Sequence, residues 1–386
     1  MRQQPAGRPR RPLALATLTL CLAALTGPRL AGAQPVRVLL AEGRTAFTVA
    51  SAGGLTITDA TGRHILAQRA GSASFRLQLQ RNSVLVREAK VGAPILLVWP
   101  GRTPTVELEG QSFRGRLEVR SINGALGVVN VVELEDYLQG VIKDEIPPGW
   151  PAEAAKAVAI AARTYAVYQR QQNPEAVFYL RATTASQVYG GATGEDARTS
   201  WAVQATRGQI LTFAGQPISA FYHSCSGGAT EDAPDVFGLS YDVIVGVKDD
   251  FSLNCPYALW VERLTTQQVQ QALARAGYAI GQLLRLDALI RSRTGRILRL
   301  AVQHTQGQLV LEGRRFREAL GNELVRSTNF EVQNDVGGFT FVGRGSGHGV
   351  GLSQWGAKEM ADLAYHHRDI LKFYYPLAEI RSLTGR

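Results

Sequence analysis

The stretch VIKDEIPPGWPAEAAKAVAIAARTYAV (141–167) decides how the chain folds, because a double proline separates two helical patterns of different character. The residues LEDYLQGVIK place apolar side chains at i, i+4, i+7 and i+8, which predicts an amphipathic helix over 134–143. Pro151 suits the first position of a second helix that runs to about Gln172. This second helix is small and apolar on nearly every face, so we expect it to be buried.

The residues that precede these helices have the alternation of β-strands. Apolar and polar side chains alternate in FRLQLQ (75–80), TVELEG (105–110) and FRGRLEVRSI (113–122), with Gly and Asn between the runs. The pattern predicts antiparallel sheet from Val36 to about Val132, with one face solvated.

The rest of the chain mixes both kinds of element. Residues 196–235 are typical of short strands and turns, a helix is expected over 265–277, and RILRLAVQ (296–303) and QLVLEG (308–313) are further strands before a short helix near Phe316. Because the elements lack a regular βαβ rhythm, we predict an α+β fold built around the buried alanine-rich helix.

The N-terminus resembles an export signal. Four arginines precede the apolar run 13–25, which is too short to span a bilayer, and Ala31-Gly32-Ala33 has the small-x-small pattern of a cleavage site. We therefore predict a signal peptide over 1–33 and an exported mature chain, in the periplasm or the cell wall, without a transmembrane segment. The alternatives are a membrane anchor or a disordered basic tail.

Charge and composition exclude few classes of function. The formal charge of +10 falls to +5 once residues 1–33, which hold five arginines and no acid, are removed. A mildly basic exported protein suits an anionic cell envelope, although the same charge can serve solubility alone. The absence of a basic helix with interleaved aromatic residues argues against a nucleic-acid partner.

Two cysteines remain after Cys21 leaves with the signal. Cys225 and Cys255 form an even count in an oxidising compartment, so we expect a disulfide, which would stabilise the fold by roughly 3–4 kcal/mol. The alternative is a metal site with His223, two residues before Cys225. A disulfide sulfur cannot act as a thiolate nucleophile, which argues against a Cys-His protease.

Glu145 is the first candidate for chemistry. It follows the C-terminal end of a predicted helix, and Ile146, Pro147 and Trp150 give it an apolar setting, so both features should raise its pKa. A raised pKa is what a general acid needs near neutral pH. The alternative is an ordinary solvated loop glutamate. Asp144 is its neighbour in sequence and points elsewhere, so the two do not make a catalytic pair.

Arg163 and His348 are the next candidates. A buried arginine needs a carboxylate or carbonyl partner, so Arg163 either orients Glu145, binds a substrate oxygen or forms a structural ion pair. In GRGSGHGVG (343–351), alternating glycines can bring backbone N–H groups and the His348 ring close to a ligand, or can simply form a tight turn around a packed histidine.

Four segments of the sequence resemble the SpoIID/LytB family of bacterial cell-wall proteins, the group of stage II sporulation protein D and the amidase enhancer. The segments are VVNVVELEDYLQGVIKDEIPPGWPAEAAKAVAIAARTYAV (128–167), FYHSCSGG (221–228), RFREALG (315–321) and GRGSGHGVGLSQWGAKEMA (343–361). The resemblance implies a strand-rich segment over 34–115 and a catalytic region over 116–386, with 260–335 as a strand and helix subdomain within it.

The resemblance also implies a function on peptidoglycan. Sporulation members of the family are lytic transglycosylases that cut the MurNAc–GlcNAc bond of glycan strands lacking stem peptides, and their catalytic glutamate and helix arginine correspond to Glu145 and Arg163. The alternative is a non-catalytic wall-binding protein that stimulates a cell-wall amidase. The residues expected to bind sugar are His348, Gly347, Gly349, Gln354 and His223.

One feature departs from the family pattern. Some members bind zinc through a histidine with two cysteines closely following it. Here Cys255 lies far downstream of His223 and Cys225, after Asp249 and Asp250. This spacing favours the disulfide, and neither a metal nor another cofactor is expected.

Overall fold

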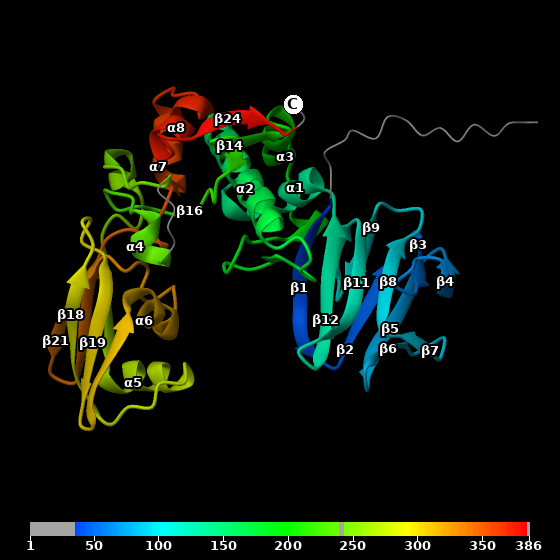
Figure 1. Cartoon of the computed structure of the whole chain (residues 1–386), viewed down its shortest axis with the longest axis horizontal. Helices are drawn as coiled ribbons and strands as arrows, with labels where there is room; N and C mark the ends of the chain where they lie inside the picture. Colours follow the sequence, from blue (N-terminus) through cyan, green and yellow to red (C-terminus); the bar gives the residue numbers. More distant parts are fainter. Residues whose placement is uncertain (1–34, 239–242, 384–386) are drawn as a thin grey trace, which may run out of the picture.

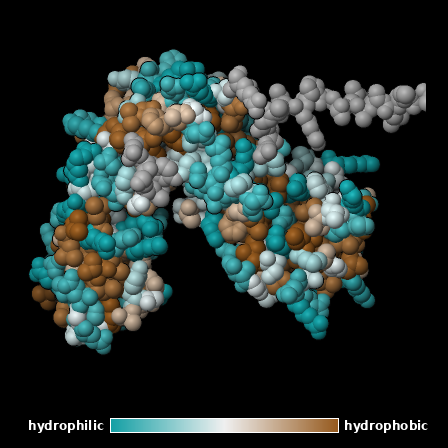
Figure 2. All heavy atoms as spheres, in the orientation of Figure 1, coloured by the Kyte–Doolittle hydropathy of each residue, from teal (hydrophilic) through white to brown (hydrophobic). Residues whose placement is uncertain are grey.

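The computed structural model describes residues 35–238 and 243–383. The signal peptide expected over 1–33, with Cys21, lies outside the described residues. Figure 1 shows a β-sandwich of N-terminal strands, a helical part around α2 (Ala152–Gln172), and a third part of sheet and helix from the C-terminal half. In Figure 2 the sandwich and the third part extend from the helical part with open space between them. Among the described residues, no helix has both the length and the hydrophobicity to cross a bilayer.

The sandwich consists of two antiparallel sheets whose apolar faces pack together. The first follows the order β13 (Leu180–Arg181), β1 (Val36–Arg44), β12 (Ala125–Val132), β11 (Arg116–Ile122), β8 (Ile95–Pro100), β3 (Gly54–Thr58) and β4 (Ile65–Ala70), and only β13 is parallel to its neighbour. The second follows the order β10 (Gln111–Arg114), β9 (Thr105–Leu108), β2 (Ala46–Ser51), β5 (Ala73–Gln80), β6 (Ser83–Val86) and β7 (Val91–Ala93). Alternate residues of β2 and β5 are buried, as the sequence pattern predicts.

The sandwich crosses the domain boundary expected between 115 and 116. Strand β11 pairs with β8, and β12 pairs with β1, so strands from both sides of that boundary form one sheet. A single hydrophobic core runs from sandwich residues such as Val38 and Val128 into α2 residues such as Ile160. The strand-rich part and the helical part therefore share one interior.

The helical part surrounds α2. Eight of its 21 residues are alanine, whose small side chain lets neighbouring elements approach closely. Four helices contact it: α1 (Leu134–Glu145), α3 (Ala197–Ala205), α7 (Gln354–Asp362) and α8 (His367–Tyr374). A small sheet of β15 (Gln216–Pro217), β14 (Gln209–Phe213) and β24 (Glu379–Ser382) lies beside it. Helix α3 was not expected within 196–235. It begins at Asp196, whose carboxylate accepts hydrogen bonds from the backbone N–H groups of Arg198 and Thr199.

The third part has a separate core centred on Phe316, Phe330 and Phe341. Its sheets are β17 (Trp260–Thr265), β22 (Gly338–Gly343) and β21 (Phe330–Asp335), and β18 (Leu283–Arg291), β19 (Ile297–His304) and β20 (Gly307–Glu312), with α5 (Thr266–Arg275) and α6 (Gly313–Leu320). Because β22 is the central strand of the first of these sheets, the third part extends beyond residue 335, where its end was expected.

The remaining elements are short, and all except the first, which packs on α1 and β10, connect the second and third parts. They are η1 (Gly191–Gly194), β16 (Tyr222–His223), α4 (Ala233–Phe237), η2 (Asp250–Asn254) and β23 (Leu352–Ser353). Mixed helices and largely antiparallel sheets, without a βαβ rhythm, confirm the predicted α+β class.

Candidate functional site

Glu145 is the last residue of α1, and its carboxylate is held by donors from three separate segments. The backbone N–H of Val188 donates to Oε1 at 2.9 Å, and the side-chain amide of Gln354 donates to Oε2 at 3.1 Å. The Tyr222 hydroxyl is also hydrogen-bonded to this carboxylate. The side chain is half-buried, so it is fixed by its neighbours and is not the freely solvated glutamate of the alternative interpretation.

The surroundings raise the pKa of Glu145 above its usual range. Burial is the largest cause, and the nearby charge of Asp144 acts in the same direction. The three hydrogen bonds oppose this shift because they favour the ionised form, yet burial outweighs them. None of the main causes is the charge of a Lys or Arg, so the carboxyl is balanced between a protonated form that burial favours and a carboxylate that the donors can stabilise.

Tyr222 and its partners form a buried chain behind the acid. The Tyr137 hydroxyl donates to Oε1 of Gln187 at 3.0 Å, and Nε2 of Gln187 donates to the Tyr222 hydroxyl at 2.9 Å. Because Tyr222 accepts from Gln187, its own O–H is free to point at Glu145. The sequence reasoning missed all three residues; the only available signal was the position of Tyr222 within FYHSCSGG, one residue before His223.

Pairing of two distant motifs brings Gln354 to Glu145. Strand β16 runs parallel to β23, with Tyr222 opposite Leu352 and His223 opposite Ser353. The Ser353 side chain accepts from the Gly356 N–H and starts α7, whose first residue is Gln354. Gln354, expected to bind sugar, is therefore placed as a hydrogen-bond donor to Glu145.

The structure does not bring Arg163 to Glu145. Its guanidinium is fully buried and makes a two-pronged ion pair with Glu135, at 3.0 Å from Nε and 2.8 Å from Nη2. It also donates to the carbonyl oxygens of Val203 and Gln209. Glu135 and Glu145 are ten residues apart on α1, which corresponds to about 15 Å. The expected direct role of Arg163 in catalysis is corrected to the structural ion pair, because its donors are already used at the far end of α1.

His348 and His223 lie in an aromatic cluster close to the acid and do not bond to it. The His348 ring packs edge-on against Phe221 and Phe237, and its centroid is 5.4 Å from that of His223. Burial, with the nearby charges of Arg317 and Arg296, lowers the pKa of His348 to about 3, so its ring is neutral at physiological pH. Burial likewise holds the pKa of His223 well below its usual range.

The glycines of the 343–351 loop make room for buried side chains. Both Gly347 and Gly349 have positive φ, at 104° and 84°. A Cβ on Gly347 would lie 2.7 Å from Cβ of His223, and one on Gly349 would overlap the guanidinium of Arg296. These two glycines therefore allow His223 and Arg296 to pack closely against the loop. This corresponds to the alternative in which the glycines form a tight turn around a packed histidine.

Cys225 and Cys255 are joined in a disulfide, as the cysteine count suggests. With its sulfur in that bond, Cys225 offers no thiolate, so the residues around His223 do not fit the zinc site of some family members. Nδ1 of His223 is instead hydrogen-bonded to the Val350 carbonyl. The disulfide ties the loop after β16 to η2, beside the paired strands that carry Tyr222 and Ser353.

Pockets open on both sides of the chain segment that carries Glu145. A pocket of about 530 Å³ lies between the sandwich and the residues Asp144, Val188 and Tyr189. A pocket of about 340 Å³ begins two residues after Glu145 and is lined by the double proline, Trp150 and Trp201. Residues on either side of Glu145 in the sequence thus line two pockets, although its own carboxylate lines neither of them.

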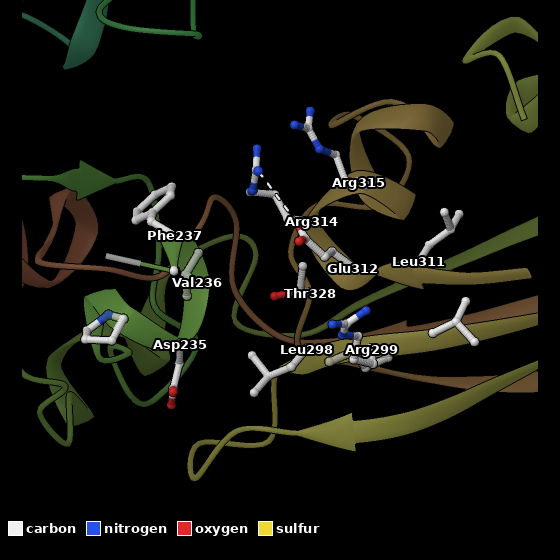
Figure 3. Close-up of a pocket in the computed structure, with 14 residues that line it drawn as sticks. Asp235, Val236, Phe237, Leu298, Arg299, Leu311, Glu312, Arg314, Arg315 and Thr328 are labelled. Carbon is white, nitrogen blue, oxygen red and sulfur yellow. Dashed lines mark ion pairs between the residues drawn. The ribbon is translucent and has the colours of Figure 1, made fainter. Parts of the chain in front are cut away.

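A further pocket of about 510 Å³ lies away from Glu145. Figure 3 shows it between Val236 and Phe237 of α4 on one side and Arg314 and Arg315 of α6 on the other. The two arginines share an ion pair with Glu318, and Arg314 also pairs with Glu312, so the positive charge on that wall is already compensated.

Comparison with known proteins agrees with the resemblance seen in the sequence. Residues 122–213 match a family model described as stage II sporulation protein, and 253–351 match one described as a domain of unknown function. Stage II sporulation protein D of Bacillus amyloliquefaciens is 31% identical over 329 residues, which cover 80% of this chain and 87% of the relative.

Two other relatives extend the comparison. An uncharacterized protein of Brachyspira hyodysenteriae is 33% identical over 269 residues, covering 69% of this chain and 72% of that protein. The amidase enhancer of Bacillus subtilis is 28% identical over 299 residues, covering 64% of this chain and 40% of that protein. The chain belongs to the SpoIID family, whose members include stage II sporulation protein D and the amidase enhancer.

Proposed function

We propose that this protein is a lytic transglycosylase that cuts the MurNAc–GlcNAc bond of peptidoglycan strands without stem peptides, with Glu145 as both acid and base. The observation that carries the proposal is the setting of Glu145: a half-buried carboxyl with a raised pKa, three hydrogen-bond donors and no cationic partner among the residues that the structure describes. Such a group can hold a proton at neutral pH and can also be stabilised after losing it.

The proposed reaction needs only one carboxyl group. Protonated Glu145 donates its proton to the glycosidic oxygen as the bond from that oxygen to C1 of the muramyl sugar breaks. The resulting carboxylate, stabilised by Val188, Gln354 and Tyr222, then takes the proton of the muramyl C6 hydroxyl while O6 attacks C1. The products are a 1,6-anhydromuramyl end and a free hydroxyl on the departing sugar, and no water is consumed.

The position of the neighbouring carboxylate, Asp144, supports transglycosylation over hydrolysis. Hydrolysing glycosidases use two carboxyl groups that flank the bond. Asp144, the neighbour of Glu145, lies against the backbone of Gly190 and is ion-paired with Lys143 at 3.3 Å. It is therefore occupied on the side of η1 and does not face the same space as Glu145.

Mass spectrometry of the products tests this function directly. The purified mature chain is incubated with peptide-free glycan, and we expect anhydromuramyl ends that disappear in Glu145→Gln. Tyr165→Phe serves as a matched control, since Tyr165 packs on Phe221 without bonding to the acid. Products that persist in Glu145→Gln would remove this residue from its role, and activity lost on chelation would favour a zinc-dependent hydrolase instead.

The second candidate is a non-catalytic enhancer of a cell-wall amidase. The observation in its favour is the 28% identity with the amidase enhancer of Bacillus subtilis. This role predicts that the protein alone releases nothing from glycan while raising the rate of an added N-acetylmuramoyl-L-alanine amidase. Both roles place the mature chain outside the cytoplasm, in the periplasm or the cell wall, where it would meet glycan strands.

A further inference from the structure

We propose that the pocket after the double proline binds a muramyl sugar of the glycan strand, and that Arg198 at its rim recognises the carboxylate left when the stem peptide is removed. We call it the tryptophan pocket. It is lined by Pro147, Pro148, Trp150, Ala155, Arg198 and Trp201, among others. This inference rests on the proposed function, because it assigns a subsite and a selectivity to the same glycan.

The tryptophan pocket is linked to the site of Glu145 by the proline turn and by a contact between two tryptophan rings. The double proline follows the acid directly, so one rigid turn fixes both. The Trp150 ring meets the Trp355 ring edge-on, with centroids 5.0 Å apart. Trp355 follows Gln354, the amide donor to Glu145. A glycan strand bound in the tryptophan pocket would therefore lie against the proline turn that follows Glu145.

The lining suits the apolar face of a sugar ring. Trp201 is 53% exposed although it is the largest side chain of α3, and an exposed indole beside a hollow commonly marks a binding site. Lys156 lies 4.9 Å from the centre of its ring and covers part of it. The volume of about 340 Å³ is at the lower end of the range for small-ligand sites, which fits a sugar unit rather than a protein segment.

The charge at the rim of the tryptophan pocket determines which form of the muramyl sugar it favours. Lys156 is committed to Glu153 at 2.6 Å, whereas Arg198 is exposed and has no ion pair within 35–238 and 243–383. Removal of the stem peptide from a muramyl residue turns a neutral amide into a lactyl carboxylate. Arginine binds a carboxylate through two parallel hydrogen bonds, and it has no equivalent interaction with an amide. Arg198 would therefore favour stripped strands over strands that carry peptides.

Binding measurements in the Glu145→Gln background test the pocket without cleavage. The probes are peptide-free glycan fragments, and the same fragments with their lactyl carboxylates converted to methylamides. We expect Arg198→Ala to weaken binding of the carboxylate form by roughly tenfold and to leave the methylamide form unchanged. Arg207→Ala, which removes an exposed arginine just beyond the other end of α3, is the matched control and should change neither.

The aromatic half of the proposal has its own variants. Trp201→Ala should weaken both probes by a similar factor, while Trp201→Phe should retain most of the affinity, and circular dichroism checks that each variant folds. Wild-type affinity in Trp201→Ala, or equal losses for both probes in Arg198→Ala, would overturn the proposal. Neither result touches the role of Glu145, which is judged separately by anhydromuramyl products from the otherwise unmodified chain.

Discussion

The two ends of helix α1 carry carboxylates with opposite environments. Glu135, in the first turn, is joined to the buried guanidinium of Arg163 by two hydrogen bonds. Glu145, in the last turn, accepts from an amide, a hydroxyl and a backbone N–H, and within 35–238 and 243–383 no cation donates to it. A cation fixes a carboxylate in its charged form, whereas neutral donors leave the proton free to come and go. The ion pair of Glu135 therefore suits a structural role, and the neutral donors around Glu145 suit a general acid.

The largest expected effect is on activity at the Glu145 end. Glu145→Gln removes the proton donor and keeps the size of the side chain, so we expect the rate of anhydromuramyl formation to fall about 10²- to 10⁴-fold, with the fold intact. The rate is measured by mass spectrometry of timed digests, with circular dichroism on the same sample. If the variant loses its fold together with its activity, Glu145 has a structural role, as Glu135 does.

The next effect is on stability at the Glu135 end. Arg163→Met leaves the Glu135 carboxylate unpaired in the interior, which should lower the free energy of unfolding by about 3–5 kcal/mol. The Arg163→Met, Glu135→Leu double variant should recover much of this loss, because no uncompensated charge remains. Denaturant unfolding measures both, and Arg293→Met, at an exposed site, is the control. A loss confined to activity would restore the direct role first expected for Arg163.

A smaller effect should appear in the pH dependence of activity. Tyr222→Phe removes a donor that favours the ionised form of Glu145, so the pKa of Glu145 should rise further. Activity needs the protonated acid and falls as the pH rises through that pKa, so the alkaline limb of kcat/KM should move to higher pH. Tyr165→Phe should leave the limb in place. If the alkaline limb moves to lower pH instead, Tyr222 does not act as a hydrogen-bond donor to Glu145.

The smallest effect concerns a third carboxylate, beyond the proline turn. Burial alone would raise the pKa of Glu153, but hydrogen bonds from Lys156 and His367 outweigh it and lower the pKa to about 2. Because the folded value is below the unfolded one, the stabilisation is present above about pH 4.5 and is lost as the pH falls toward 2. Allowing for solvent screening, Glu153→Gln should cost about 1 kcal/mol at pH 7.

Urea unfolding of wild type and Glu153→Gln at several pH values measures this difference. We expect the two curves to converge as the pH is lowered from 4.5 toward 2. A difference that stays constant over that range would show that Glu153 acts through packing rather than through its charge.

The sequence was sufficient where a signal is local. The proline pair and the run of alanines specify where α1 ends and where α2 lies, and the observed bounds agree with the expected helices to within two residues. Alternation of apolar residues likewise predicts the sandwich strands. The cysteine count also points to the pair that the structure joins.

The rest depends on contacts between distant segments. Gln354 and Val188 reach Glu145 only because β16 pairs with β23 and because the 187–191 segment packs on α1 at Gly140. The periodicity of apolar residues within one element does not predict such contacts between distant elements. Arg163 looked catalytic because a buried arginine implies a carboxylate partner, and the sequence does not say which glutamate of α1 it meets. Helix α3 was missed because its nine residues give a weak pattern and only the cap Asp196 marks its start.

The pairing of β11 and β12 with β8 and β1 has a consequence for how this protein could be divided. A shortened chain starting at residue 116 would keep every group around Glu145 and yet expose both edges of a two-stranded ribbon, together with apolar residues such as Leu117 and Val128 that are now buried. Such a fragment should aggregate rather than act as a portable catalytic module. Any shorter version of this chain that keeps the site around Glu145 must therefore keep the first strands along with the helices.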